Sequence, residues 1–232
     1  MKNVAFKALT GSYNQRLNIE GSDRDYKVIC IPSFNDLYMG KFIDGQIHSE
    51  EVDIEYIDIR SFVYQIRRGN PNYLEILFSL EFSDVSTFDL VSFIEEHKND
   101  LLFINPMETY HALRGMMCSN MKKDDSKSVY RFFQCSFAIE NYVKALTAED
   151  GYKSFYTEER VFRPCPEQAD ILKSIKSGAK INKNFKQLAL TDIDNLKDKL
   201  KEFETPKKSS LKAFVELEKL VKNIVFDQAI GI

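Results

Sequence analysis

The spacing of apolar residues changes part-way along this chain, and that change most constrains its fold. Before about residue 105, strand-like stretches at 26–31 and 52–57 alternate with helical patterns. Beyond it the strand signals fade and apolar side chains recur at helical spacing. This order predicts an α+β fold in which a small mixed β-sheet, covered by helices, is followed by a helical domain. We place the two domains at residues 1–110 and 111–232.

Local signals predict where several helices begin and end. A helix that contains Phe62 and Ile66 is expected to end near Gly69, and Asn70 is expected to cap the next helix, with Pro71 at its first position. Four more helices are expected in the second half, at residues 128–146, 167–177, 191–203 and 209–228.

Charge is distributed unevenly along the chain. The net charge is −3, but residues 1–110 carry 10 basic and 18 acidic side chains, whereas the remainder has a net charge of +5. No apolar run approaches the length of a bilayer span, and the first residues lack the extended apolar segment of a secretory signal. These features indicate a soluble, cytoplasmic protein without a membrane partner. The four cysteines have no zinc-ligand spacing, so we expect buried free thiols.

The segment that indicates chemistry pairs a Gly-Ser turn with two closely spaced aspartates. Gly11-Ser12 is followed, after ten residues, by Asp23-Arg24-Asp25. Carboxylates at positions i and i+2 of a strand leave the same face and can converge on a divalent cation. A Gly-Ser turn offers backbone N–H groups and a hydroxyl without a bulky side chain, which suits a phosphate.

A third carboxylate on an adjacent strand would complete a site for two hard cations with oxygen ligands. Asp53 and Glu55 share one face of the strand expected at 52–57, and either could supply it. A nucleoside triphosphate carries several negative charges, so carboxylates alone would repel it. Two Mg²⁺ ions would reverse that sign, activate an attacking hydroxyl and neutralise the leaving pyrophosphate.

These residues also carry a family resemblance. Gly11-Ser12, followed by residues 22–26, resembles the signature of the DNA polymerase beta nucleotidyltransferase superfamily. More narrowly, the chain is similar to its bacterial and phage branch of predicted nucleotidyltransferases. Further stretches that match this branch are residues 31–32, 38–40, 52–55, 61–62, 69–72, 75–78, 130–131, 167–168 and 175–178.

The resemblance implies a nucleotidyltransferase domain and a role for each matching residue. Asp23 and Asp25 would bind Mg²⁺ or Mn²⁺, and Gly11 and Ser12 would hold the β- and γ-phosphates of a nucleoside triphosphate such as ATP. Asp53 would be the third metal ligand, which activates an acceptor hydroxyl through the metal. The implied reaction transfers a nucleoside monophosphate to RNA, a protein or a small molecule and releases pyrophosphate.

Other residues are secondary candidates. Glu55 is the reserve third carboxylate, and Arg67 and Arg68 could contact a triphosphate or an RNA backbone, although a solvated helix end explains them more simply. The chain also departs from the family pattern at residues 13–16, which follow the Gly-Ser pair, and at Arg24, where an apolar residue is common.

Two further functions compete with nucleotidyl transfer. The first is a catalytically weak binding module of the same fold that acts through a protein partner, as in toxin–antitoxin pairs, with the basic second half as its interface. The second is a metal-dependent phosphohydrolase that uses similar carboxylates.

Overall fold

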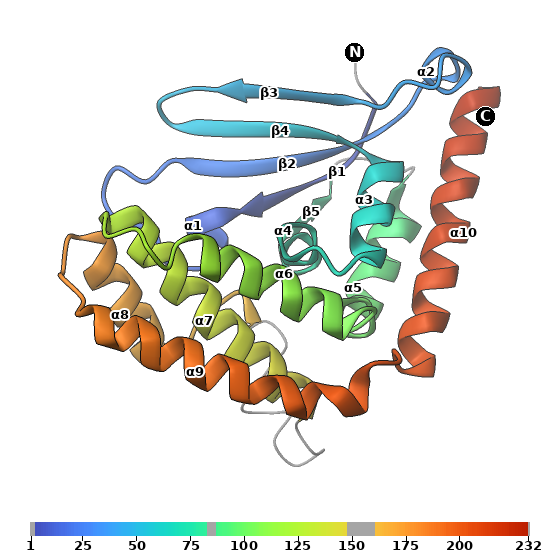
Figure 1. Ribbon diagram of the computed structural model, residues 1–232. Coiled ribbons are helices and arrows are strands. Elements are labelled where there is room, and N and C mark those ends of the chain that lie inside the picture. Colours follow the sequence, from blue (N-terminus) through green and yellow to red (C-terminus); the bar gives the residue numbers. More distant parts are fainter. Residues whose placement is uncertain (1–2, 83–86, 148–160, 232) are drawn as a thin grey trace. The chain divides into compact units, whose positions relative to one another are not determined.

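A five-stranded mixed β-sheet organises the N-terminal part of the chain (Figure 1). In the computed structural model, which describes residues 3–82, 87–147 and 161–231, the strands lie in the order β3-β4-β2-β1-β5. Strands β2 and β4 are parallel, and the other neighbouring pairs are antiparallel. The expected small mixed sheet followed by helices is therefore confirmed. The strands are β1 (Asn3–Thr10), β2 (Arg24–Ile31), β3 (Asp44–His48), β4 (Val52–Asp58) and β5 (Leu80–Phe82).

Burial along the two central strands rises from the end that carries Asp25 and Asp53 to the other end. Phe6, Ile29 and Ile57 are buried on one face of the sheet, where the ring of Phe62 from helix α3 meets that of Phe6 edge-on, with their centroids 5.4 Å apart. Val28 lies on the opposite face and is half-buried. The helices of this part are α1 (Gly11–Asn14), α2 (Phe34–Tyr38), α3 (Ile59–Arg67), α4 (Pro71–Leu74), the 3₁₀ helix η1 (Glu75–Phe78) and α5 (Phe88–Leu102).

The expected helix boundaries around residue 70 are confirmed. Helix α3 ends at Arg67, and Gly69 follows with a φ of +63°, a backbone conformation that glycine adopts without strain. The side chain of Asn70 accepts a hydrogen bond from the backbone N–H of Asn72 and so caps α4, with Pro71 at the first helical position.

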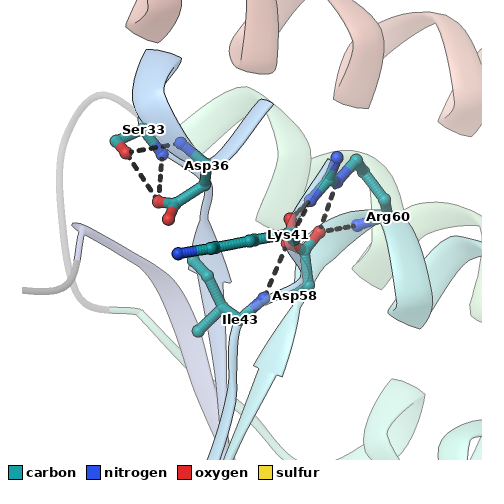
Figure 2. A network of polar contacts seen from close by, with 6 residues as sticks. All are labelled: Ser33, Asp36, Lys41, Ile43, Asp58 and Arg60. Atoms are coloured by element: carbon teal, nitrogen blue, oxygen red, sulfur yellow. Dashed lines mark hydrogen bonds and ion pairs between the residues drawn. The ribbon is translucent and has the colours of Figure 1, made fainter. Parts of the chain in front are cut away.

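A buried carboxylate fixes the junction between β4 and α3 (Figure 2). Asp58 is fully buried, and it accepts hydrogen bonds from the backbone N–H of Ile43 at 3.1 Å and of Arg60 at 2.9 Å. The Arg60 guanidinium donates to both of its oxygens at 2.8 Å and to the carbonyl of Lys41. Asp58 therefore joins the end of β4, the start of α3 and the chain entering β3, and its buried charge is compensated.

The chain forms two units, and their boundaries differ from the expected division at residue 110. The first unit contains residues 1–14, 20–104 and 206–232, and the second contains residues 15–19 and 105–205. The C-terminal helix α10 (Lys208–Ile230) belongs to the first unit because Phe214, Leu217 and Val221 are buried where it packs against α3 and α5 (Figure 1).

In the described part of the second unit, all regular secondary structure is helical. Phe132, Ile139 and Tyr142 of α7 are completely buried, which confirms the amphipathic helix expected at 128–146. Gly178, with a φ of +99°, follows α8 where the sequence predicted its end. No helix in the described residues has the length and apolarity needed to cross a membrane. The helices are α6 (Pro106–Ser119), α7 (Ser126–Thr147), α8 (Pro166–Lys176), α9 (Lys183–Leu200) and the 3₁₀ helix η4 (Lys201–Phe203).

Candidate metal centre

A row of four polar residues crosses one end of the sheet. Asp25 of β2 is in register with Thr10 of β1 on one side and with Asp53 of β4 on the other, and Asp53 is in register with His48 of β3. Residues in register on neighbouring strands project from the same face. The sheet therefore places two carboxylates side by side, with a hydroxyl and an imidazole at the two ends of the row.

The three aspartates singled out by the sequence come together at this end of the sheet. One carboxylate oxygen from each of Asp23, Asp25 and Asp53 lies within 4.8 Å of the other two. Asp23 precedes β2 and is exposed, whereas Asp25 and Asp53 are half-buried. Within the described ranges this is the only group of three or more histidine, cysteine or acidic side chains that converges in this way.

Gly11 is required by the position of the Asp25 carboxylate. Gly11 has a φ of +65°, and a Cβ at this position would lie 2.1 Å from Asp25 Oδ2, far inside contact distance. Any other residue would strain the backbone and displace the carboxylate. The Gly-Ser turn and the DxD pair, which lie ten residues apart in the sequence, are therefore in direct contact.

Further hydrogen bonds hold the Gly-Ser turn beside β2. The hydroxyl of Thr10 donates to the Asp25 carbonyl at 3.3 Å. At the other end of α1, the buried Asn14 amide donates to the buried Glu75 carboxylate at 3.1 Å. No local sequence pattern indicates this link, because its two residues are 61 positions apart.

Arg24 contacts Tyr13, so the two segments in which the sequence departs from the pattern of the family it resembles lie together. The guanidinium of Arg24 lies 5.3 Å from the centre of the Tyr13 ring, and Arg24 is exposed. This geometry is a cation–π contact. Because alternate residues of a strand face opposite sides, Arg24 projects away from the face that carries Asp25.

Glu55 has a different partner from Asp53. It forms an ion pair with Lys27, its register neighbour on β2, and the Lys27 ammonium lies 5.3 Å from the centre of the Tyr73 ring. Burial, and secondarily the charge of Glu55, raise the pKa of Tyr73 above its ordinary value. The geometry thus places Asp53 in the carboxylate group and pairs Glu55 with a cation.

His48 was not identified as a site residue from the sequence. Its Nδ1 lies 3.1 Å from Asp53 Oδ1, and its Nε2 lies 3.2 Å from Gln46 Oε1. A short turn brings β3 back against β4, because the Ser49 hydroxyl both donates to the Val52 carbonyl and accepts from its N–H. Only the register of this hairpin places His48 beside Asp53, and the β3 sequence gave no clear strand signal.

Arg67 and Arg68 lie at the C-terminal end of α3. This helix follows the last residue of β4, whereas Asp53 lies near the first residue of that strand. The Arg67 guanidinium lies 3.9 Å from the Glu218 carboxylate of α10, and Arg68 donates to the Tyr64 hydroxyl at 3.2 Å. These contacts are those of a solvent-facing helix end.

The donor set fits Mg²⁺ or Mn²⁺. All three converging ligands are carboxylates, which these hard cations prefer, and three negative charges within 4.8 Å repel one another unless a cation compensates them. The approach of Asp25 to Gly11 keeps that carboxylate beside the turn expected to hold phosphates.

The comparisons with known proteins add no family assignment. No protein-family model matches the chain, and no curated protein matches it significantly.

Proposed function

We propose that this protein is a metal-dependent nucleotidyltransferase that moves a nucleoside monophosphate from a nucleoside triphosphate to an acceptor hydroxyl. The observation that carries the proposal is the convergence of Asp23, Asp25 and Asp53 next to the Gly11-Ser12 turn. Phosphoryl transfer depends mainly on positioning and on compensation of phosphate charge. A carboxylate group beside a Gly-Ser turn is suited to both needs.

In this proposal each residue takes the role that the family resemblance implies for it. Asp23 and Asp25 would hold the ions that face the triphosphate, and Gly11 and Ser12 would contact its β- and γ-phosphates. Asp53 would orient the acceptor hydroxyl. Mg²⁺ ions held by these aspartates would supply Lewis acidity, which would lower the pKa of the attacking hydroxyl, and positive charge, which would compensate the leaving pyrophosphate. The acceptor is an RNA end, a protein side chain or a small molecule.

Labelled nucleotides test the proposal directly. The chain is incubated with Mg²⁺, cellular RNA and protein, and each nucleoside triphosphate labelled at the α- or the γ-phosphate. Transfer of the α-label to an acceptor, with pyrophosphate release, is expected for the natural chain and for Glu55→Gln, and is expected to be lost in the Asp23→Asn/Asp25→Asn double variant. Release of inorganic phosphate without a labelled acceptor would instead identify a phosphohydrolase.

Absence of both reactions from the natural chain would contradict an enzymatic function and would favour the binding module that acts through a protein partner. Stable co-purification with such a partner would then be the informative measurement.

A further inference from the structure

The edge strand β3 adds a nitrogen donor to the row of carboxylates. His48 is in register with Asp53, and its Nδ1 lies 3.1 Å from Asp53 Oδ1. The imidazole side chain is 65% exposed and that of Asp53 is 32% exposed, so solvent and ions reach both. His48 contacts Asp53 from strand β3, on the side of β4 that faces away from β2 and Asp25.

The 3.1 Å between these two atoms is the length of an ordinary hydrogen bond, and it is also close to the separation of two adjacent ligands on one ion. Ligands bound at about 2.1–2.2 Å and at right angles to each other lie about 3.0 Å apart. Rotation of either side chain by a small amount would therefore let one cation contact both atoms without a change in the backbone. Gln46 Oε1, at 3.2 Å from Nε2, restrains the other side of the ring, as outer partners do for metal-binding histidines.

We propose that His48 is a metal ligand that, together with Asp53, holds a divalent transition-metal ion at the outer side of the carboxylate group. This inference rests on the proposed function and specifies which metal the site takes. Mg²⁺ is bound by oxygen atoms, whereas transition-metal ions also accept an imidazole nitrogen, and Mn²⁺ is the one among them that carboxylates suit as well. His48 therefore makes the site selective for Mn²⁺ over Mg²⁺.

Mn²⁺ is also the probe that tests the inference, because its unpaired electrons sense a directly bonded nitrogen. The full chain is loaded with Mn²⁺ alone and studied by pulsed electron paramagnetic resonance. A ¹⁴N modulation from a coordinated imidazole is expected in the natural chain and should disappear in His48→Gln. The chain has three histidines, and His111→Gln, in helix α6 of the second unit, is the matched control that should keep the signal.

Metal affinity gives a second readout that does not depend on activity. Titration of each variant should show that His48→Gln weakens Mn²⁺ binding about tenfold or more, with a much smaller change for Mg²⁺. A circular dichroism spectrum like that of the natural chain would exclude misfolding, which is not expected at an exposed edge-strand position.

The outcomes separate this inference from the proposed function. Mn²⁺ bound with no ¹⁴N modulation, or with a modulation that persists in His48→Gln, would overturn the role of His48 and leave the carboxylate site intact. Failure of the natural chain to bind Mn²⁺ or Mg²⁺ at all would overturn the metal centre itself, and the role of His48 with it.

Discussion

Asp25 and Asp53 occupy the same register on two neighbouring parallel strands, so their carboxylates leave the sheet side by side from the same face. A parallel pair needs a crossover connection, and here residues 32–51 supply it, including α2 and the edge strand β3. Two residues 28 positions apart thus become adjacent, and Asp23 joins them from the segment before β2.

Neutralising one aspartate should change the response of stability to metal ions. Asp23→Asn is expected to raise the free energy of unfolding by about 0.5–1 kcal/mol in the presence of a chelator, because it relieves repulsion within the carboxylate group. The same variant should lose most of the stabilisation that Mg²⁺ gives the natural chain. Thermal melting with and without Mg²⁺ measures both effects. Equal Mg²⁺ stabilisation of variant and natural chain would argue against a metal centre.

Asp53 and Glu55 form a matched pair on one strand. Asp53→Asn should reduce nucleotidyl transfer by about 10³-fold or more, as loss of a catalytic carboxylate does. Glu55→Gln removes only the partner of Lys27 and should leave transfer within about tenfold of the natural rate. Rates measured at saturating nucleotide check the pair. The reverse order of effects would reassign the third carboxylate to Glu55.

Gly11→Ala tests the close approach of the turn to Asp25. The added methyl group would occupy the position of Asp25 Oδ2, and the positive φ would cost roughly 1–2 kcal/mol of stability. We expect weaker Mg²⁺ binding as well as a lower free energy of unfolding, measured by calorimetric titration and chemical denaturation. Gly21→Ala is the matched control: its φ is +77°, but nothing lies within 4 Å of its added methyl group. Loss of Mg²⁺ binding in both variants would show that backbone strain alone explains the effect.

Asp58→Asn should destabilise the first unit without altering the chemistry directly. The carboxylate is fully buried and accepts from Ile43 and Arg60, and an amide cannot provide the same set of acceptors or the charge that faces the guanidinium. The expected loss is about 2–3 kcal/mol in the free energy of unfolding, measured by urea denaturation. Asp36→Asn, at the exposed cap of α2 in the same region, should cost much less. Equal losses would contradict the buried role of Asp58.

Burial raises the pKa of the Cys135 thiol to about 12, so its reactive thiolate is scarce near neutral pH. At pH 8 about one Cys135 thiol in ten thousand would be ionised, whereas Cys118 and Cys165 are partly exposed and should be alkylated first. The unfolded thiol ionises at its ordinary, lower pKa. The stability gained by burying the neutral thiol is therefore complete below that pKa and lost as the pH rises towards 12. Mass spectrometry after timed alkylation measures the order, and early labelling of Cys135 would contradict its burial.

Much of the fold could be predicted from the sequence because several elements carry strong local signals. Strands β2 and β4, the cap at Asn70 and helix α7 follow from alternation, capping chemistry and helical spacing. Strand β3 could not be found in this way, because all five of its residues are exposed and its sequence includes Gly45. Edge strands lack the buried pattern that identifies central strands.

The residues of the candidate site also fall into two groups: those with a local sequence signal and those that only strand pairing brings into place. Asp23 and Asp25 are recognisable from their spacing, and one face of a single strand supplies both Asp53 and Glu55. The choice between them depends on Lys27, whose pairing with Glu55 is a matter of strand register. The contact of His48 with Asp53 also depends on pairing between strands, which no short stretch of sequence encodes.

The place of α10 in the first unit has a consequence for how the chain folds during synthesis. The surfaces of α3 and α5 that α10 covers are made long before residues 208–230 emerge from the ribosome. The sheet-containing unit therefore completes its core only after the whole helical unit has been synthesised, and a fragment that stops at residue 110 would leave those apolar surfaces exposed to aggregation.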